Sequence, residues 1–95
     1  MNQQEACNLL EQQLARYRTV RYSDLVAKID SQECFEILGP SGVEYQVEIQ
    51  FFWDGRSHCN IRVIGSIDDG GLRAFYPMCE SFIMTPEGEC VANGR

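Results

Sequence analysis

Apolar residues in the first part of the chain recur with a helical spacing. Ala6, Leu9, Leu10, Leu14 and Tyr17 fall at positions i, i+3, i+4, i+8 and i+11, which lie on one face of a helix. The sequence therefore predicts an amphipathic helix over residues 3–17 and a shorter helix over residues 24–29. Side-chain oxygens suited to helix caps stand at the predicted starts, namely Asn2 with Glu5 as its capping-box partner, and Ser23.

From residue 32 the spacing changes to alternation, which is typical of half-buried strands. The clearest run covers residues 43–53, where every second residue is apolar. Further strands are predicted at 32–38, 59–67, 72–77 and 80–85. Turn residues separate them, including Gly39-Pro40-Ser41-Gly42, Asp54-Gly55 and Asp69-Gly70.

The turns also predict a register. A three-residue loop at 55–57 would place Phe51 opposite Ile61 and Asp54 opposite His58. A two-residue hairpin at Asp69-Gly70 would place Ile67 opposite Leu72. Both pairings bring apolar residues together on one face, as burial of that face requires.

These elements predict an α+β fold, in which an N-terminal helix and a short second helix pack on a four- or five-stranded antiparallel β-meander. We expect one domain over residues 1–95, with the helical part at 3–29, the sheet at 32–89 and a frayed tail at 90–95. Whether strand 32–38 pairs with 43–53 stays open at this stage.

The face of the sheet that the helices do not cover is predicted to be mixed rather than purely polar. Its candidate ligand or interface residues are Phe52, Arg62, Ile64, Arg73, Phe75 and Phe82. Contiguous apolar side chains on an exposed face mark an interaction surface. Three interpretations compete, namely a covering tail or loop, a homodimer formed through this face, and a site for a small molecule or peptide.

The balance of acidic and basic residues argues against some classes of binding partner. The chain has 14 acidic and 8 basic residues and a net charge of −6. Nucleic-acid binding requires a basic surface, so no nucleic-acid partner is predicted. No apolar stretch is long enough for a membrane span, and the polar first residues do not resemble a signal peptide, so we expect a cytoplasmic protein without a membrane partner.

The five cysteines give no metal signature. Cys7, Cys34, Cys59, Cys79 and Cys90 are far apart in sequence, without the close pairs that zinc sites use. We predict reduced thiols, with Cys7 and Cys59 buried and Cys79 exposed, and no cofactor or metal.

Two groups of residues could form a functional site, one catalytic and one anion-binding. Asp54, His58 and Asp69 stand at predicted hairpin ends, where a small enzyme site would need them to converge. Arg62 and Arg73 could clamp an anion, or these arginines could pair across strands with Glu48 or Glu44.

The segment from Tyr45 to Phe82 includes Arg62-Val63-Ile64-Gly65-Ser66-Ile67-Asp68-Asp69-Gly70-Gly71 and Arg73-Ala74-Phe75. With these residues, the size and the acidity, the chain resembles small uncharacterised bacterial hypothetical proteins of the mobile integron-cassette kind. The resemblance implies no activity and no site residues.

The sequence thus favours a non-enzymatic binding or interaction module that uses the open sheet face and forms a homodimer. The alternatives are an acidic partner of a basic protein, in the manner of an immunity protein or antitoxin, and a small enzyme at the hairpin ends.

Overall fold

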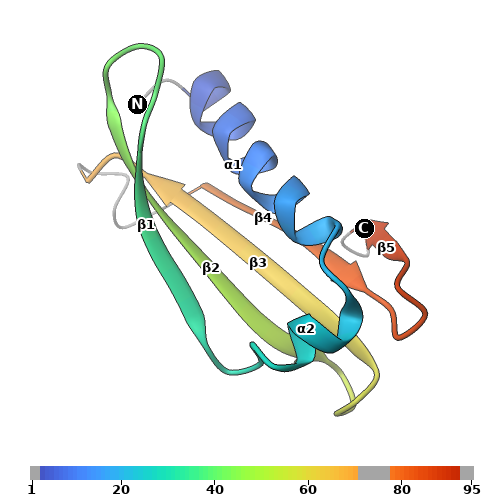
Figure 1. Ribbon diagram of the computed structural model, residues 1–95. Helices are drawn as coiled ribbons and strands as arrows, with labels where there is room; N and C mark the ends of the chain where they lie inside the picture. The colour runs from blue at the N-terminus through green and yellow to red at the C-terminus, as the bar shows by residue number, and fades with distance from the viewer. Residues whose placement is uncertain (1–2, 71–77, 93–95) are drawn as a thin grey trace.

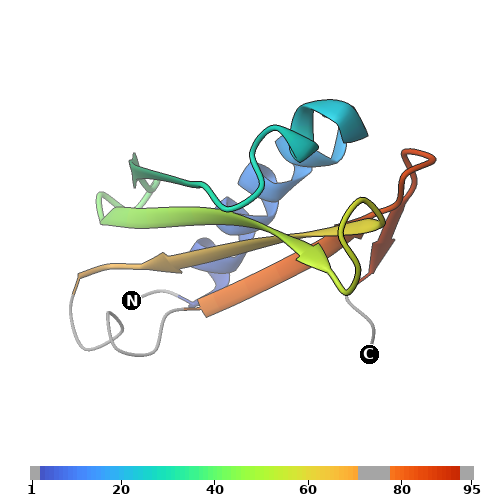
Figure 2. The ribbon, with the colours of Figure 1, turned by 90° about the horizontal axis from the view of Figure 1, so that it is seen from below.

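The computed structural model describes residues 3–70 and 78–92, and it confirms the α+β class. Two helices lie on one side of a single five-stranded antiparallel sheet of strand order β1-β2-β3-β4-β5 (Figures 1 and 2). The elements are α1 (Gln3–Arg18), α2 (Tyr22–Val26), β1 (Gln32–Leu38), β2 (Glu44–Asp54), β3 (Asn60–Asp68), β4 (Met78–Met84) and β5 (Cys90–Ala92). The open question about strand 32–38 is answered, since β1 pairs with β2.

The core forms where the apolar face of α1 meets the sheet. The five residues with helical spacing are all buried, and they pack on alternate residues of β2, β3 and β4. Tyr45, Ile49, Phe51, Ile61 and Val63 are fully buried in this layer. The periodicity of helix and strands therefore determines which face of the sheet is covered.

Two side-chain clusters hold the helical layer to the sheet. The Glu5 carboxylate on α1 accepts hydrogen bonds from the Ser41 amide at 2.9 Å, the Ser41 hydroxyl at 2.7 Å and the Tyr45 hydroxyl at 2.7 Å. Near the other end of α1, Glu33 of β1 accepts hydrogen bonds from the Tyr17 hydroxyl and, at 2.6 Å, from Lys28. Partial burial and this carboxylate raise the pKa of Tyr17 to about 12.

The β2–β3 register differs from the prediction by two residues. Phe51 faces Val63 rather than Ile61, and Asp54 faces Asn60 rather than His58. The loop is longer than three residues because Cys59 donates its amide to the Arg56 carbonyl and His58 adopts a φ of 64°. A shift of two keeps every side chain on its predicted face.

The strand that pairs with the second long edge of β3 was predicted wrongly. Ile67 of β3 faces Met78 of β4, where the hairpin prediction has Leu72. The predicted strand 72–77 lies outside the described residues. The predicted frayed tail is also wrong at its start, because Cys90–Ala92 form β5 against β4.

The second helix begins and ends earlier than predicted. It covers Tyr22–Val26 instead of 24–29, and Arg21 rather than Ser23 stands at the N-cap without a side-chain cap. Tyr22 instead donates its hydroxyl to the Cys59 carbonyl at 2.6 Å, which ties α2 to the β2–β3 loop. Asn2, the predicted cap of α1, lies outside the described residues.

Candidate functional site: the open face of the sheet

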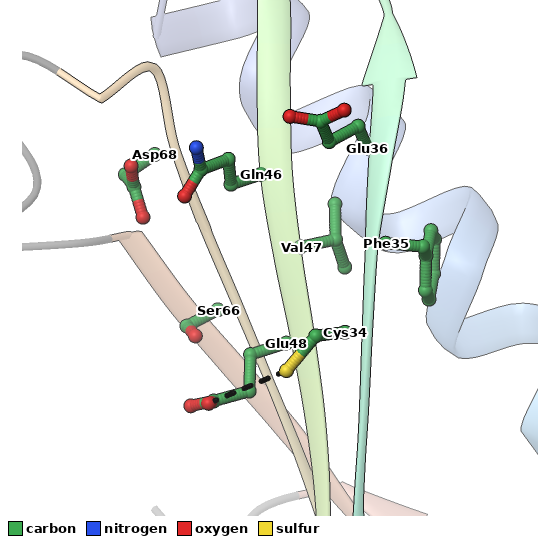
Figure 3. Close-up of a pocket in the computed structure, with 8 residues that line it drawn as sticks. All are labelled: Cys34, Phe35, Glu36, Gln46, Val47, Glu48, Ser66 and Asp68. Carbon is green, nitrogen blue, oxygen red and sulfur yellow. Dashed lines mark hydrogen bonds between the residues drawn. The ribbon is translucent and has the colours of Figure 1, made fainter.

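The face of the sheet opposite the helices carries the candidate site. Within the described residues both helices pack on the other face, and β5 extends the sheet sideways rather than covering it. We call this uncovered side the open face. Figure 3 looks onto part of it, with the helices behind the strands.

Antiparallel pairing arranges the open-face side chains in rows across the strands, about 7 Å apart along each strand. The rows are counted from the β2–β3 loop. They are Phe52-Arg62-Ile83-Val91, Gln32-Gln50-Ile64-Ser81, Cys34-Glu48-Ser66-Cys79 and Glu36-Gln46-Asp68. Their chemistry therefore changes along the strands, from apolar in the first row to acidic in the fourth.

The apolar strip consists of Phe52, Ile64, Ile83 and Val91, contributed by four adjacent strands. Phe52 is 39% exposed and Val91 is 48% exposed, whereas Ile83 retains only 7%. The exposed parts of Phe52 and Val91, together with the half-buried Ile64, form an apolar surface that gains free energy when a partner covers it.

Arg62 lies in the middle of the apolar strip. Its Nε and Nη2 donate to Asp54 Oδ1 at 3.2 and 3.0 Å, and its Nη1 donates to the Ser81 hydroxyl at 3.4 Å. Arg62 therefore pairs with Asp54 rather than with Glu44 or Glu48. The side chains of Arg62 and Asp54 are 28% and 29% exposed, and Asp54 largely neutralises the guanidinium within the strip.

The predicted site residues are thus placed as follows. Phe52, Arg62 and Ile64 lie together on the open face. Phe82 does not, because it faces Val63, is 1% exposed and lies in the core under the Arg18 guanidinium, 5.2 Å from its ring centroid. Arg73 and Phe75 lie outside the described residues.

Sequence reasoning missed Ile83 and Val91. Residues 82–84 are all apolar, so alternation alone does not decide whether Phe82 or Ile83 faces the helices. Pairing of Ile67 with Met78 decides it, and this pairing was not predicted. Val91 was assigned to the tail.

The acidic end of the open face consists of Glu36, Glu44, Glu48 and Asp68. Around it the sheet is hollowed by a volume of about 380 Å³, which Glu36, Glu48 and Asp68 border together with Cys34, Gln46 and Ser66 (Figure 3). The size is within the range of ligand pockets. Three of the lining residues, Glu36, Glu48 and Asp68, are carboxylates, which suits a cationic occupant.

The thiols on this face are not activated. Cys34 donates to Glu48 Oε2 at 3.7 Å. Partial desolvation, together with the Glu48 carboxylate, raises the pKa of Cys34, and desolvation raises the pKa of Cys79. Both thiols therefore stay protonated, which is unfavourable for a nucleophile. Cys79 is exposed as predicted, but Cys59 is exposed where burial was predicted, and Cys7 is partly exposed.

The alternative enzyme site does not assemble. Asp54 and His58 lie at the β2–β3 loop, whereas Asp69 follows the far end of β3, roughly 27 Å away along the strand. His58 instead packs edge-on against Trp53, with ring centroids 5.1 Å apart. Over residues 3–70 and 78–92, no group of three or more His, Cys, Asp or Glu side chains is placed to hold a metal ion.

Comparison with family models, with curated proteins and with solved structures finds no match. The resemblance to integron-cassette proteins therefore stays a prediction. No helix in the described part of the chain is long and apolar enough to cross a membrane.

Proposed function

We propose that the protein is a non-enzymatic interaction module whose binding surface is the open face of the sheet. The observation that carries the proposal is the apolar strip, in which Phe52 and Val91 are exposed and Ile64 is half-buried on a face that no described element covers. In this proposal the protein works in the cytoplasm, where its five free cysteines stay reduced.

A second copy of the chain is the first partner to test, because twofold dimers are the commonest assemblies. The apolar strip around the neutralised Arg62–Asp54 pair would lie at the centre of such a dimer. Light scattering over a range of protein concentrations measures whether the chain associates. A mass of two chains supports the homodimer. A mass of one chain at every concentration would show that the open face does not bind a second copy and that its partner is a different molecule.

Substitution of Phe52 tests the surface itself. Phe52→Thr keeps a residue that suits a strand but removes the aromatic ring, and Leu38→Thr is the matched control at an exposed apolar position outside the strip. If the exposed part of the ring serves a partner, Phe52→Thr lowers the free energy of unfolding of the monomer by only about 1 kcal/mol, because only the part of the ring already covered within the chain contributes to folding.

The same variant weakens partner binding or self-association more than Leu38→Thr does, because Leu38 lies on the same face beside Glu44 but outside the apolar strip. A loss of about 2 kcal/mol or more in urea unfolding of monomeric Phe52→Thr would show that the ring is covered within the folded chain, and would overturn the proposal.

A further inference from the structure

Charge is balanced differently on the two sides of the molecule. The described cations of the helical layer are Arg16, Arg18, Arg21 and Lys28, and they lie among carboxylates of the same side. Three of these cations form ion pairs there, namely Arg18 with Glu11, Arg21 with Asp24 and Lys28 with Glu33. Among the described residues the open face carries five carboxylates, on Glu36, Glu44, Glu48, Asp54 and Asp68, and one cation, on Arg62. The open face therefore has the larger excess of unpaired negative charge among the described residues, and its field favours a cationic partner.

The carboxylates of the acidic end are not used by the fold as ion pairs. Arg62 is bound to Asp54, and within residues 3–70 and 78–92 no salt bridge reaches Glu36, Glu44, Glu48 or Asp68. Glu48 accepts only a weak hydrogen bond from the Cys34 thiol, and Asp68 accepts one from the Gly70 amide at 2.8 Å. Charge-assisted hydrogen bonds from outside the chain are thus available at this end.

Apolar and acidic rows lie at a fixed separation. Six residues along β3 separate Arg62 in the first row from Asp68 in the fourth, which corresponds to about 20 Å. An extended segment of about seven residues spans the same length. A segment with an apolar side chain at one end and cations toward the other would complement both parts of the face at once.

A second copy of the chain fits the whole face less well. Two open faces stacked in parallel would bring the two acidic ends together. Stacked antiparallel, they would lay each acidic end on the partner's apolar strip, where unpaired carboxylates lose their hydration without gaining a counter-charge. Only a partner of opposite charge relieves both problems.

We propose that the open face binds a basic protein, whose extended segment places an apolar side chain on the apolar strip and Lys or Arg side chains in the hollow of the acidic end. This inference rests on the proposed function and names its partner class. Electrostatic complementarity of this kind increases the association rate and fixes the orientation of the segment.

A synthetic probe makes the proposal testable. The probe is the extended peptide Leu-Thr-Phe-Thr-Lys-Thr-Lys-Thr-Lys, in which Phe and the last Lys on the same side are about 20 Å apart. Its reversed sequence covers the opposite chain direction. Two control peptides carry Glu in place of Lys, or Thr in place of Leu and Phe. Isothermal titration calorimetry at low and high salt measures the binding of each peptide to the full chain.

The expected result is binding of the Lys probe in one direction, with an affinity that falls as salt rises, and no binding of the Glu probe. Glu36→Gln/Glu48→Gln weakens binding by about tenfold or more, because two charge pairs are lost. Glu87→Gln/Glu89→Gln is the matched control, since it removes the same charge from the β4–β5 turn, and it changes the affinity by less than about twofold because exposed distant charges are screened. Phe52→Thr also weakens binding.

Three results would overturn the inference. They are no binding of the Lys probe in either direction, affinity that is insensitive to salt, and equal losses in the Glu36/Glu48 and Glu87/Glu89 variants. If the chain is also a dimer that Phe52→Thr dissociates, the inference fails while the proposed function stands. If Phe52→Thr unfolds the monomer, the proposed function fails as well.

Discussion

Gly65 sets the distance between α1 and the sheet. A Cβ atom at this position would lie 2.9 Å from Leu10 Cδ1, 3.1 Å from Leu14 Cδ2 and 3.2 Å from Ile49 Cδ1. All three neighbours are fully buried, so they have little room to move aside. The missing side chain therefore allows the helix to pack directly over β3.

Gly65→Val should destabilise the protein by roughly 1–3 kcal/mol, because two sides of the core would have to move apart to admit the new methyl groups. The higher strand propensity of Val does not offset this overlap. Urea unfolding measures the change. Ser66→Val is the control, since it adds a similar side chain one residue away on the open face. Equal stability of Gly65→Val and the natural protein would contradict this view of the packing.

Single residues also show where sequence reasoning fails. Periodicity placed Phe52, Ile64 and the buried residues of β2 on the correct sides, because polar and apolar residues alternate there. It misplaced Phe82, because Phe82, Ile83 and Met84 are all apolar. The alternating pattern is satisfied whether the even-numbered or the odd-numbered residues face the helices. Only the partner strand decides which of them faces the helices, and that is a long-range property.

At the scale of elements, Glu5 connects α1 to the β1–β2 hairpin. Three hydrogen bonds from Ser41 and Tyr45 stabilise its charged form. The side-chain hydrogen bonds from Ser41 and then Tyr45 lower the pKa of Glu5 from its ordinary value of 4.5. The folded state therefore releases this proton at a lower pH than the unfolded state does.

The sign of the pH effect follows from linkage. Because the pKa is lower in the folded state, the contribution of Glu5 to stability is fully present above the unfolded value of 4.5 and is lost as the pH falls through the folded value. Glu5→Gln should lower stability at neutral pH and make the decline below pH 4.5 shallower. Part of the decline should remain, since hydrogen bonds from Lys28 and then Tyr17 also lower the pKa of Glu33.

Urea midpoints measured from neutral pH into acid test this prediction. Glu87→Gln is the control, because it removes one carboxylate from the β4–β5 turn without touching the hairpin. A decline in acid as steep in Glu5→Gln as in the natural protein would show that the Glu5 contacts contribute no pH-dependent stability.

Element boundaries and pairings were predictable to different degrees. The helical spacing predicted α1 to within one residue of its end, and alternation predicted β1 and β2 closely. The β2–β3 register was off by two, because the conformation of His58 lengthens the loop and no turn motif signals it. The pairing of β3 with β4 was missed because Asp69-Gly70 resembles a tight hairpin, although the strand that follows in the sheet begins only at Met78.

At the scale of the whole molecule, the open face gathers carboxylates that repel one another, and this arrangement is unfavourable for the stability of the isolated protein. The α+β class followed from the change of period near residue 32, since period determines which elements can share a core. The concentration of carboxylates on one face did not follow from net charge. It depends on the register that brings Glu36, Glu48 and Asp68 around one hollow.

Removal of these charges should therefore stabilise the isolated protein. Glu36 faces Gln46 and Glu44 faces Leu38 on the next pair, so the two carboxylates are diagonal neighbours across β1 and β2. Like charges on neighbouring strands repel, although less at a diagonal spacing than when they are directly opposite. Glu36→Gln/Glu44→Gln should raise the melting temperature at low salt, and the difference should shrink at high salt because the repulsion is screened.

The same variant should bind the Lys probe less tightly. The natural carboxylates would then lower the stability of the isolated protein while they strengthen binding. Thermal unfolding followed by circular dichroism at two salt concentrations, together with the calorimetric titration, measures both effects on one preparation. A variant that is less stable than the natural protein at low salt would show that the fold itself uses these carboxylates. The carboxylates of the open face would then serve folding rather than the binding of a basic partner.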